Sequence, residues 1–99
     1  MVYELKATNQ KSYYGKATVI ELSNVKYLKS YDTIVCYLVN NTLYKSWNDY
    51  SATTMKHINS FLKANNMDTI SKKEWEIFVP YRQITLKQHN AILNHIWES

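Results

Sequence analysis

Hydrophobic and polar residues alternate with different periods in the two halves of the chain, and the first half has the pattern of β-strands. Runs rich in β-branched and aromatic residues at 17–22, 25–29 and 32–39 predict three strands. The run at 32–39 is apolar at successive positions, which favours a central strand covered on both faces. Asn40–Asn41 tolerates positive φ and precedes TLYKSW, so it predicts a hairpin. We therefore expect a small antiparallel sheet of three to four strands within about residues 13–47.

The second half has apolar positions at helical spacing, and capping residues mark where each helix begins. Ser51 and Thr85 are predicted N-caps, and Ser71 with Glu74 matches the capping box. Pro80 disfavours helical geometry at the residue before it. The predicted helices cover about residues 51–65, 71–79 and 85–97. Strands followed by helices predict a single compact α+β domain over residues 1–99, with about three helices packed on one face of the sheet.

The first predicted helix carries polar residues beside its apolar face. On a helical wheel one arc holds Met55, Ile58, Phe61 and Leu62. Thr53 and His57 lie on one flank of this arc, and Thr54 lies at its edge. The free N–H groups and hydroxyls of this helix start would suit an anion or a partner protein. The alternative is that Ser51 and Thr54 cap the helix while His57 bonds to a neighbouring loop. The candidate partner-binding residues are Tyr50, Thr53, Thr54, Lys56 and His57.

Composition adds a surplus of aromatic residues and a moderate positive charge. Nine tyrosines and three tryptophans in 99 residues exceed what a small core needs, which favours an interface. The net charge of +4 argues against an acidic mimic of DNA. Cys36 is the one cysteine, so it forms no intramolecular disulfide and is expected to be a buried thiol. The start of the chain lacks a signal peptide and no segment would span a membrane, so we expect a cytoplasmic protein of a bacterial host cell.

Basic and aromatic residues interleave in the predicted strands, which supports a second interpretation. Such a surface would stack bases and bind phosphates of a nucleic acid. The ordinary alternative is a sheet face with cross-strand tyrosine pairs. The candidate nucleic-acid-binding residues are Lys11, Tyr13, Tyr14, Lys16, Lys26, Tyr27, Lys29, Tyr44 and Lys45.

Motifs for catalysis do not occur in the sequence. It contains no Ser-His-Asp motif, glycine-rich phosphate loop or HExxH, and its three histidines lack metal-ligand spacing. A ribonuclease toxin needs no fixed motif, only clustered Lys, Arg, His and Tyr, and it remains a third interpretation although Arg82 is the one arginine. We therefore expect no catalytic residues, no metal and no cofactor.

Two segments resemble a group of small proteins carried by phages and mobile elements of Gram-positive bacteria. The segments are SYDTIVCYL at 30–38 and YSATTMKHINSFL at 50–62, with YYGKA at 13–17 before them. The shared pattern is roughly SY(D/N)TIVA, a turn, an aromatic residue and GYSATT(M/L)RH(I/V)N(E/D)F. This chain departs from it at Asp49, Lys56 and Ser60, where Gly, Arg and an acidic residue are usual.

The resemblance implies a biological setting, that of a protein carried by a phage or another mobile element. Small proteins of mobile elements often act on host machinery, and inhibitors of CRISPR–Cas effectors are one class of them. The leading hypothesis is a non-enzymatic accessory protein that binds and inhibits a host defence effector, namely an anti-CRISPR protein acting on Cas9 or its guide-RNA complex. The alternatives are the basic nucleic-acid-binding domain and the ribonuclease toxin. The oligomeric state is open at this stage.

Overall fold

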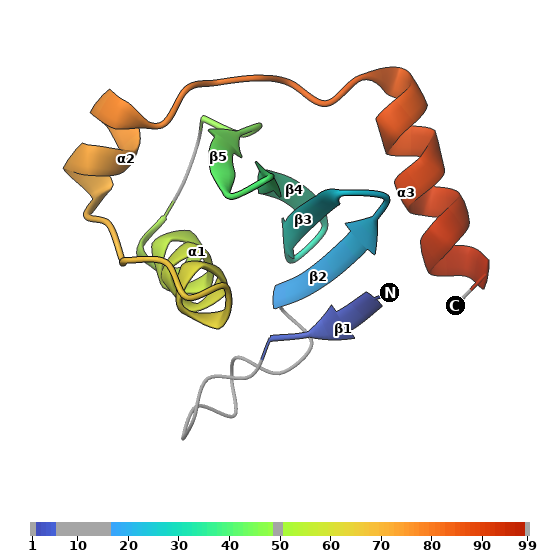
Figure 1. Cartoon of the computed structure of the whole chain (residues 1–99), viewed down its shortest axis with the longest axis horizontal. Coiled ribbons are helices and arrows are strands. Elements are labelled where there is room, and N and C mark those ends of the chain that lie inside the picture. The colour runs from blue at the N-terminus through green and yellow to red at the C-terminus, as the bar shows by residue number, and fades with distance from the viewer. Residues whose placement is uncertain (1, 6–16, 49–50, 99) are drawn as a thin grey trace.

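The structure is a computed structural model that describes residues 2–5, 17–48 and 51–98, with side chains as far as residue 95. Its described strands form one antiparallel sheet in which each strand pairs with the next along the chain (Figure 1). The strands are β1 (Val2–Glu4), β2 (Ala17–Leu22), β3 (Val25–Ser30), β4 (Thr33–Val39) and β5 (Thr42–Lys45). The α+β class is confirmed, but the sheet has five strands. The predicted number of three to four was wrong because β1, three residues long, is too short to show a period.

Two-residue turns join β2, β3, β4 and β5. Asn40 and Asn41 between β4 and β5 both have positive φ, at 50° and 67°. This confirms the predicted hairpin, because type I′ turns need positive φ at both central residues. Ser23 and Tyr31, the first turn residues of the other two hairpins, have φ of 55° and 54°. Tyr31 is unusual there, because a bulky residue seldom adopts positive φ.

The helices lie on both faces of the sheet, so the predicted packing on one face was wrong. They are α1 (Ala52–Ala64), α2 (Lys72–Phe78) and α3 (Leu86–Glu98). Figure 1 shows α1 and α2 on one side of the sheet and α3 on the other. The connector at 79–85 passes from one side to the other. It pairs with β5 on the way, since Lys45 N–H donates to Pro80 O at 2.9 Å and Arg82 N–H donates to Lys45 O at 2.8 Å.

The larger part of the core lies under α1 and α2. Val19, Leu28 and Leu38 of the sheet are buried against the apolar face of α1. Phe61 of α1 and Trp75 of α2 are fully buried in the same cluster. Each such side chain contributes about 1.5–3 kcal/mol when it leaves water. This burial fixes α1 and α2 on the sheet and positions the surfaces that they carry.

A row of tyrosines crosses the other face of the sheet. Tyr27, Tyr37 and Tyr44 occupy paired positions on β3, β4 and β5, with ring centroids 5.7 and 5.5 Å apart. The hydroxyl of Tyr37 donates to Arg82 O at 2.9 Å, and the Gln88 amide donates to the Tyr27 hydroxyl at 3.1 Å. The connector and α3 therefore cover this row. Among the described residues, no helix combines the length and apolar character needed to cross a bilayer.

Candidate functional site

The start of α1 is built as a helix cap. Ser51 has extended backbone geometry, and its hydroxyl accepts from Thr54 N–H at 3.3 Å. The hydroxyl groups of Ser51 and Thr54 also lie 3.3 Å apart and share a hydrogen bond. Thr53 is exposed and Thr54 is half-buried. Tyr50, which was predicted with them, lies outside the described residues.

His57 points into the protein rather than toward a partner. It is 0 % exposed, and its Nδ1 lies 2.7 Å from the hydroxyl oxygen of Ser30, the last residue of β3. The ring of Tyr31, in the turn that follows, lies 5.8 Å from the His57 ring, centroid to centroid. The predicted set is therefore divided. Lys56 and Thr53 face outward, whereas His57 belongs to the core between α1 and the sheet.

The Ser30–His57 pair has the spacing of a nucleophile and its general base. Such a pair acts only where substrate can reach the hydroxyl. Ser30 is 4 % exposed and His57 is fully buried, so neither group meets a substrate in this conformation. The arrangement instead supplies a hydrogen bond that a buried hydroxyl and imidazole both require. Its chemical role is to join α1 to the end of β3.

The five described lysines and tyrosines of the predicted nucleic-acid surface are not brought together. Lys26 and Lys45 point toward α1 and α2, and Lys26 Nζ donates to Asn65 Oδ1 at 2.8 Å. Tyr27, Lys29 and Tyr44 alternate with them and therefore face α3 and the connector. Tyr27 is buried in the tyrosine row. Lys11, Tyr13, Tyr14 and Lys16 lie outside the described residues.

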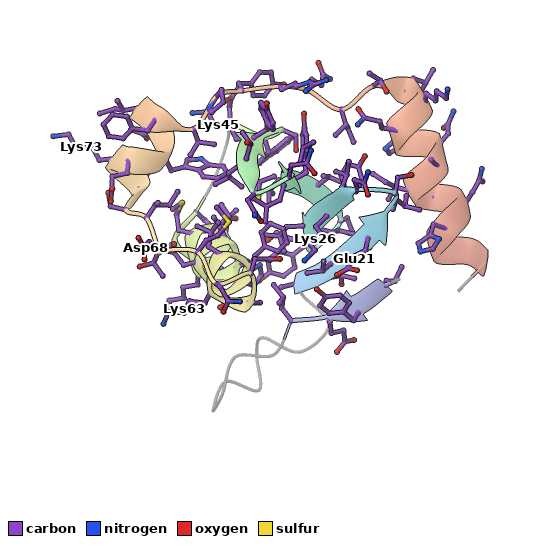
Figure 2. All side chains as sticks on the ribbon, viewed as in Figure 1. Glu21, Lys26, Lys45, Lys63, Asp68 and Lys73 are labelled. Carbon is purple, nitrogen blue, oxygen red and sulfur yellow. The ribbon has the colours of Figure 1, made fainter. Side chains whose placement is uncertain are left out.

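Lys45 is a buried ammonium group that holds the end of α2. Its Nζ donates to the carbonyl oxygens of Trp75 and Glu76, each at 3.2 Å, and lies 6.0 Å from the Trp75 ring centroid. Figure 2 shows the position of Lys45 in β5. The last carbonyl groups of a helix lack partners inside it and carry partial negative charge, so a cation is favourable there. Lys45 is thus a structural residue.

The structure leaves three large apolar side chains exposed at the end of α2 and just after it, which the sequence reasoning missed: Ile77, Phe78 and Tyr81, here called the apolar patch. Ile77 and Phe78 end α2 and are 61 % and 75 % exposed, and Tyr81 in the connector is 48 % exposed. The signal was present in the α2 sequence KKEWEIF, because Ile77 lies two residues after Trp75 and therefore points away from it on a helix. Trp75 takes the buried position, which leaves Ile77 outside, and Phe78 is exposed as the last residue of the helix.

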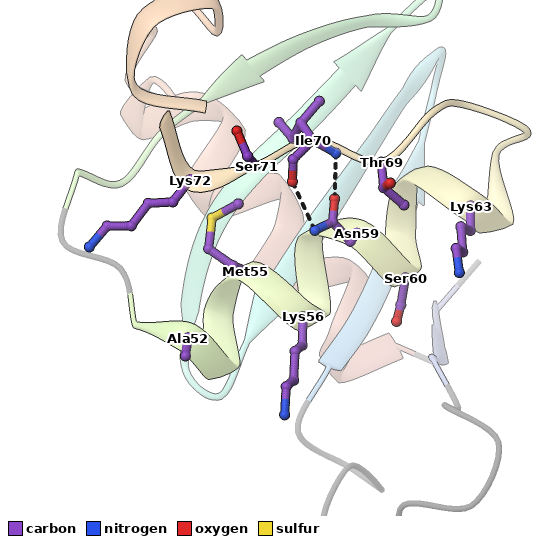
Figure 3. A pocket seen from close by; sticks show the side chains of 10 residues that line it. All are labelled: Ala52, Met55, Lys56, Asn59, Ser60, Lys63, Thr69, Ile70, Ser71 and Lys72. Carbon is purple, nitrogen blue, oxygen red and sulfur yellow. Dashed lines mark hydrogen bonds between the residues drawn. The ribbon is translucent and has the colours of Figure 1, made fainter. Parts of the chain in front are cut away.

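A groove lies between α1 and the segment that leads to α2, and Figure 3 shows it from close by. Its volume is about 630 Å³. Its apolar lining comes from Ala52, Met55 and Ile70, and lysines 56, 63 and 72 also line it. We call it the α1 groove. Of the predicted partner-binding residues that the structure describes, Lys56 lines it and Thr53, Thr54 and His57 do not.

Asn59 closes the inner side of the α1 groove. Its amide nitrogen donates to Ile70 O at 3.0 Å, and its amide oxygen accepts from Ile70 N–H at 2.9 Å. Both bonds are drawn in Figure 3. The side chain thus pairs with one residue of the segment as a neighbouring strand would. These two hydrogen bonds hold the segment against α1 and keep the groove open to one side.

Groups suited to metal or thiol chemistry are not assembled in the described part of the chain. No group of three or more His, Cys, Asp or Glu side chains there could hold a metal ion. Cys36 is fully buried, and burial raises the pKa of its thiol well above the ordinary value. A thiol that stays protonated is a poor nucleophile.

Comparison with known proteins places the chain in a family. No curated protein and no solved structure matches it. Residues 3–77, from β1 into α2, match a family model whose description is a family of unknown function, DUF8033. The match covers the sheet and the two helices on one face of it, and it ends before the connector and α3. Since this is more than half of the chain, the protein belongs to the DUF8033 family.

Proposed function

We propose that this chain is a non-enzymatic binding protein that inhibits a host defence effector, and that the effector is Cas9. The observation that carries the binding function is the apolar patch of Ile77, Phe78 and Tyr81. Large apolar side chains scattered singly on a surface need no explanation, but contiguous ones favour an interface. Here two adjacent residues and a third close by in sequence expose an aliphatic and two aromatic side chains.

The patch has the composition of an interface centre. Aromatic residues are enriched among the few side chains that carry most of the binding free energy. Lys73, Glu74 and Glu76 are exposed on the same helix and supply a polar surround. Contacts around the centre of an interface exclude water from it once a partner is bound.

The patch is held in place before binding, which favours affinity. The Lys45 ammonium bonds to two carbonyl groups of α2, and the backbone of Lys45 pairs with Pro80 and Arg82 on either side of Tyr81. Ordering a surface on binding costs free energy, so a preorganised surface binds more tightly. The anchors therefore sit on backbone that is already fixed from both ends.

Cas9 is proposed as the effector on the resemblance of residues 30–38 and 50–62 to phage and mobile-element proteins. With a net charge of +4 the chain cannot imitate DNA. It would inhibit by covering a surface of the effector or by blocking a conformational change. The nucleic-acid alternative has less support, because its five described residues lie on two faces of the sheet.

The test is cleavage of a target plasmid by guide-loaded Cas9 with the chain titrated in, together with a gel shift on the same DNA and guide without Cas9. We expect dose-dependent inhibition and no shift. Phe78→Ser should reduce the inhibition, because it removes the most exposed aromatic anchor. Leu86→Ser is the matched control, because Leu86 is 74 % exposed and lies on α3, which covers the opposite face of the sheet.

Each arm has an outcome that opposes the proposal. No inhibition at large excess of the chain would remove Cas9 as the target. A gel shift without Cas9 would favour the alternative that the chain is primarily a nucleic-acid-binding domain. Equal inhibition by Phe78→Ser and the parent chain would show that the patch is not the interface.

A further inference from the structure

The α1 groove combines an apolar interior with a basic margin. Ala52, Met55 and Ile70 supply the apolar lining, and Figure 3 shows the Met55 side chain pointing from α1 toward the segment that carries Ser71. Methionine is unbranched and polarizable, so it adapts to side chains of different shapes. A groove of about 630 Å³ has the size of a site for a small ligand or for a few side chains of a partner.

Three lysines distribute positive charge around this groove. Lys56 and Lys63 come from α1, and Lys72 begins α2. Their side chains extend at different sides of the hollow in Figure 3. None of the described lining residues is acidic. Asp68 belongs to the neighbouring segment but does not line the groove. The described lining is thus basic, which is complementary in charge to an anionic occupant.

We propose that the α1 groove binds an acidic peptide segment of the partner protein that also presents an apolar side chain. The apolar side chain enters between Met55 and Ile70, and the carboxylates lie along the lysines. This inference rests on the proposed protein-binding function and specifies the chemistry of the partner. Nothing in it depends on Cas9 being that partner.

The lining favours a peptide over a nucleic acid. Single-strand binders stack bases on aromatic side chains, and the described groove lining has no aromatic residue. It also has no arginine, the residue that matches phosphate with two parallel hydrogen bonds. Lysines act as point charges, which suits carboxylates that are spaced along a flexible segment.

The groove and the apolar patch lie at the two ends of α2. Lys72 at the start of α2 lines the groove, and Phe78 at its end belongs to the patch. Seven residues of helix span about 10 Å. A standard interface covers about 800 Å² on each partner, which is enough for both features. The acidic segment and the receptor of the patch would therefore belong to one partner surface.

The direct test is fluorescence anisotropy of the full chain with a labelled peptide of glutamate with leucine at every fourth position. The same peptide with lysine in place of glutamate and a labelled oligo-dT strand are the comparison probes. We expect the acidic peptide alone to bind, and its affinity to fall as NaCl is added because salt screens exposed charges. Lys56→Gln with Lys63→Gln should weaken it by about threefold to tenfold.

The matched control is Lys29→Gln with Lys87→Gln, which makes the same change in net charge away from the groove. Lys87 is exposed on α3, and Lys29 alternates with Ser30 and so faces away from α1. This control should bind like the parent chain. An equal loss in both double variants would overturn the proposal, because only net charge would then matter. Stronger binding of oligo-dT than of the acidic peptide would overturn it in favour of nucleic acid.

The experiments distinguish failure of the groove proposal from failure of the proposed function. If the chain inhibits Cas9 but does not bind the acidic peptide at millimolar concentration, the groove proposal is wrong and the inhibitory function stands. If it binds the peptide through Lys56 and Lys63 but leaves Cas9 cleavage unchanged, the groove proposal stands and Cas9 is not the partner. Unfolding of each variant by urea shows that all of them are compared in the folded state.

Discussion

The hydroxyl oxygen of Ser30 lies 2.7 Å from Nδ1 of His57, and both residues are buried. This hydrogen bond joins the end of β3 to the middle of α1. It also connects two sequence segments, 30–38 and 50–62, that both lie within the region matched by the DUF8033 family. The two segments therefore meet in the core of the fold, and their meeting point is not an accessible site.

We expect Ser30→Ala to destabilise the protein. The substitution removes the bond to an imidazole that water does not reach, and a buried polar group that loses its partner costs about 1–3 kcal/mol. The free energy of unfolding from urea titration should fall by that amount. Lys56→Ala, at an exposed position one residue before His57, should change it by less than about 0.5 kcal/mol. Equal stability of Ser30→Ala and the parent would show that the bond contributes nothing.

Asn59→Ala should release the segment between α1 and α2. It removes both hydrogen bonds to the main chain of Ile70, and each contributes about 0.5–1.5 kcal/mol net. The Ile70 amide should then exchange with deuterium much faster than in the parent, as NMR measures. Asn59→Asp retains an acceptor for Ile70 N–H but loses the donor to Ile70 O, so we expect an intermediate rate.

Ser60→Ala is the control for Asn59, since Ser60 is the next residue and lines the same groove. Its Ile70 amide should exchange at the parent rate. Slow exchange in Asn59→Ala would mean that apolar contacts alone hold the segment. The groove volume would then not depend on Asn59.

Lys45→Met should weaken α2. Methionine fills a similar volume, but the carbonyl groups of Trp75 and Glu76 lose a charged donor. Because burial of the ammonium also costs free energy, the net loss is about 1–3 kcal/mol rather than the sum of two charged bonds. Urea unfolding measures it. Lys73→Met, on the exposed side of α2, is the matched control and should be nearly neutral.

The secondary structure of this chain is readable from its sequence where local rules decide it. Each helix begins and ends within one residue of the predicted range. The starts follow from the predicted N-caps, since the Ser51, Ser71 and Thr85 hydroxyls accept from backbone N–H groups three residues later. The Asn40–Asn41 turn follows in the same way from its backbone preference. Strand β1 was missed because three residues carry too little pattern, and its position depends on pairing with β2.

The layer arrangement was only half readable. The 32–39 run is apolar at successive positions and predicted a strand covered on both faces of the sheet. The burial of Cys36, Tyr37 and Leu38 confirms this. Yet the helices were expected on one face, since helical periodicity does not identify the sheet face that a helix covers. Applied consistently, the double burial of β4 would have placed α3 opposite α1.

The candidate site was less readable than the fold. His57 was a candidate for partner binding, with a bond to a neighbouring loop as the alternative; it is buried and bonded to Ser30, 27 residues away, which favours the structural alternative. Lys45 looked like a surface charge because the sequence does not reveal that α2 ends beside it. The apolar patch depends on which of three apolar residues in α2 is buried. The local spacing of apolar and polar residues does not show which side chains are buried by contacts with distant parts of the chain.

Cys36 should resist alkylation while the protein is folded. It is fully buried, and burial raises the pKa of the thiol, so the thiolate that reacts with iodoacetamide is scarce and shielded. Mass spectrometry should find the parent chain unmodified in buffer and fully modified in urea above the unfolding midpoint. Fast modification in buffer would show that β4 opens locally, which its central position in the sheet argues against.

Glu74 should make the stability of α2 depend on pH. The backbone N–H of Ser71 donates to its carboxylate at 3.0 Å, and this bond, with a further contribution from the Ser71 side chain, holds the Glu74 pKa below its ordinary value of 4.5. A depressed folded-state pKa stabilises the protein at pH values above the unfolded-state pKa, and this contribution is lost as pH falls through the folded-state pKa.

The variant Glu74→Gln keeps an acceptor for the Ser71 N–H but has no titratable group at this position. The parent should therefore be more stable than Glu74→Gln at about pH 6, and the difference should shrink as pH falls below about 4.5. Urea unfolding of both proteins across this range measures it, and a difference that stays constant with pH would show that the charge of Glu74 does not contribute to the capping box.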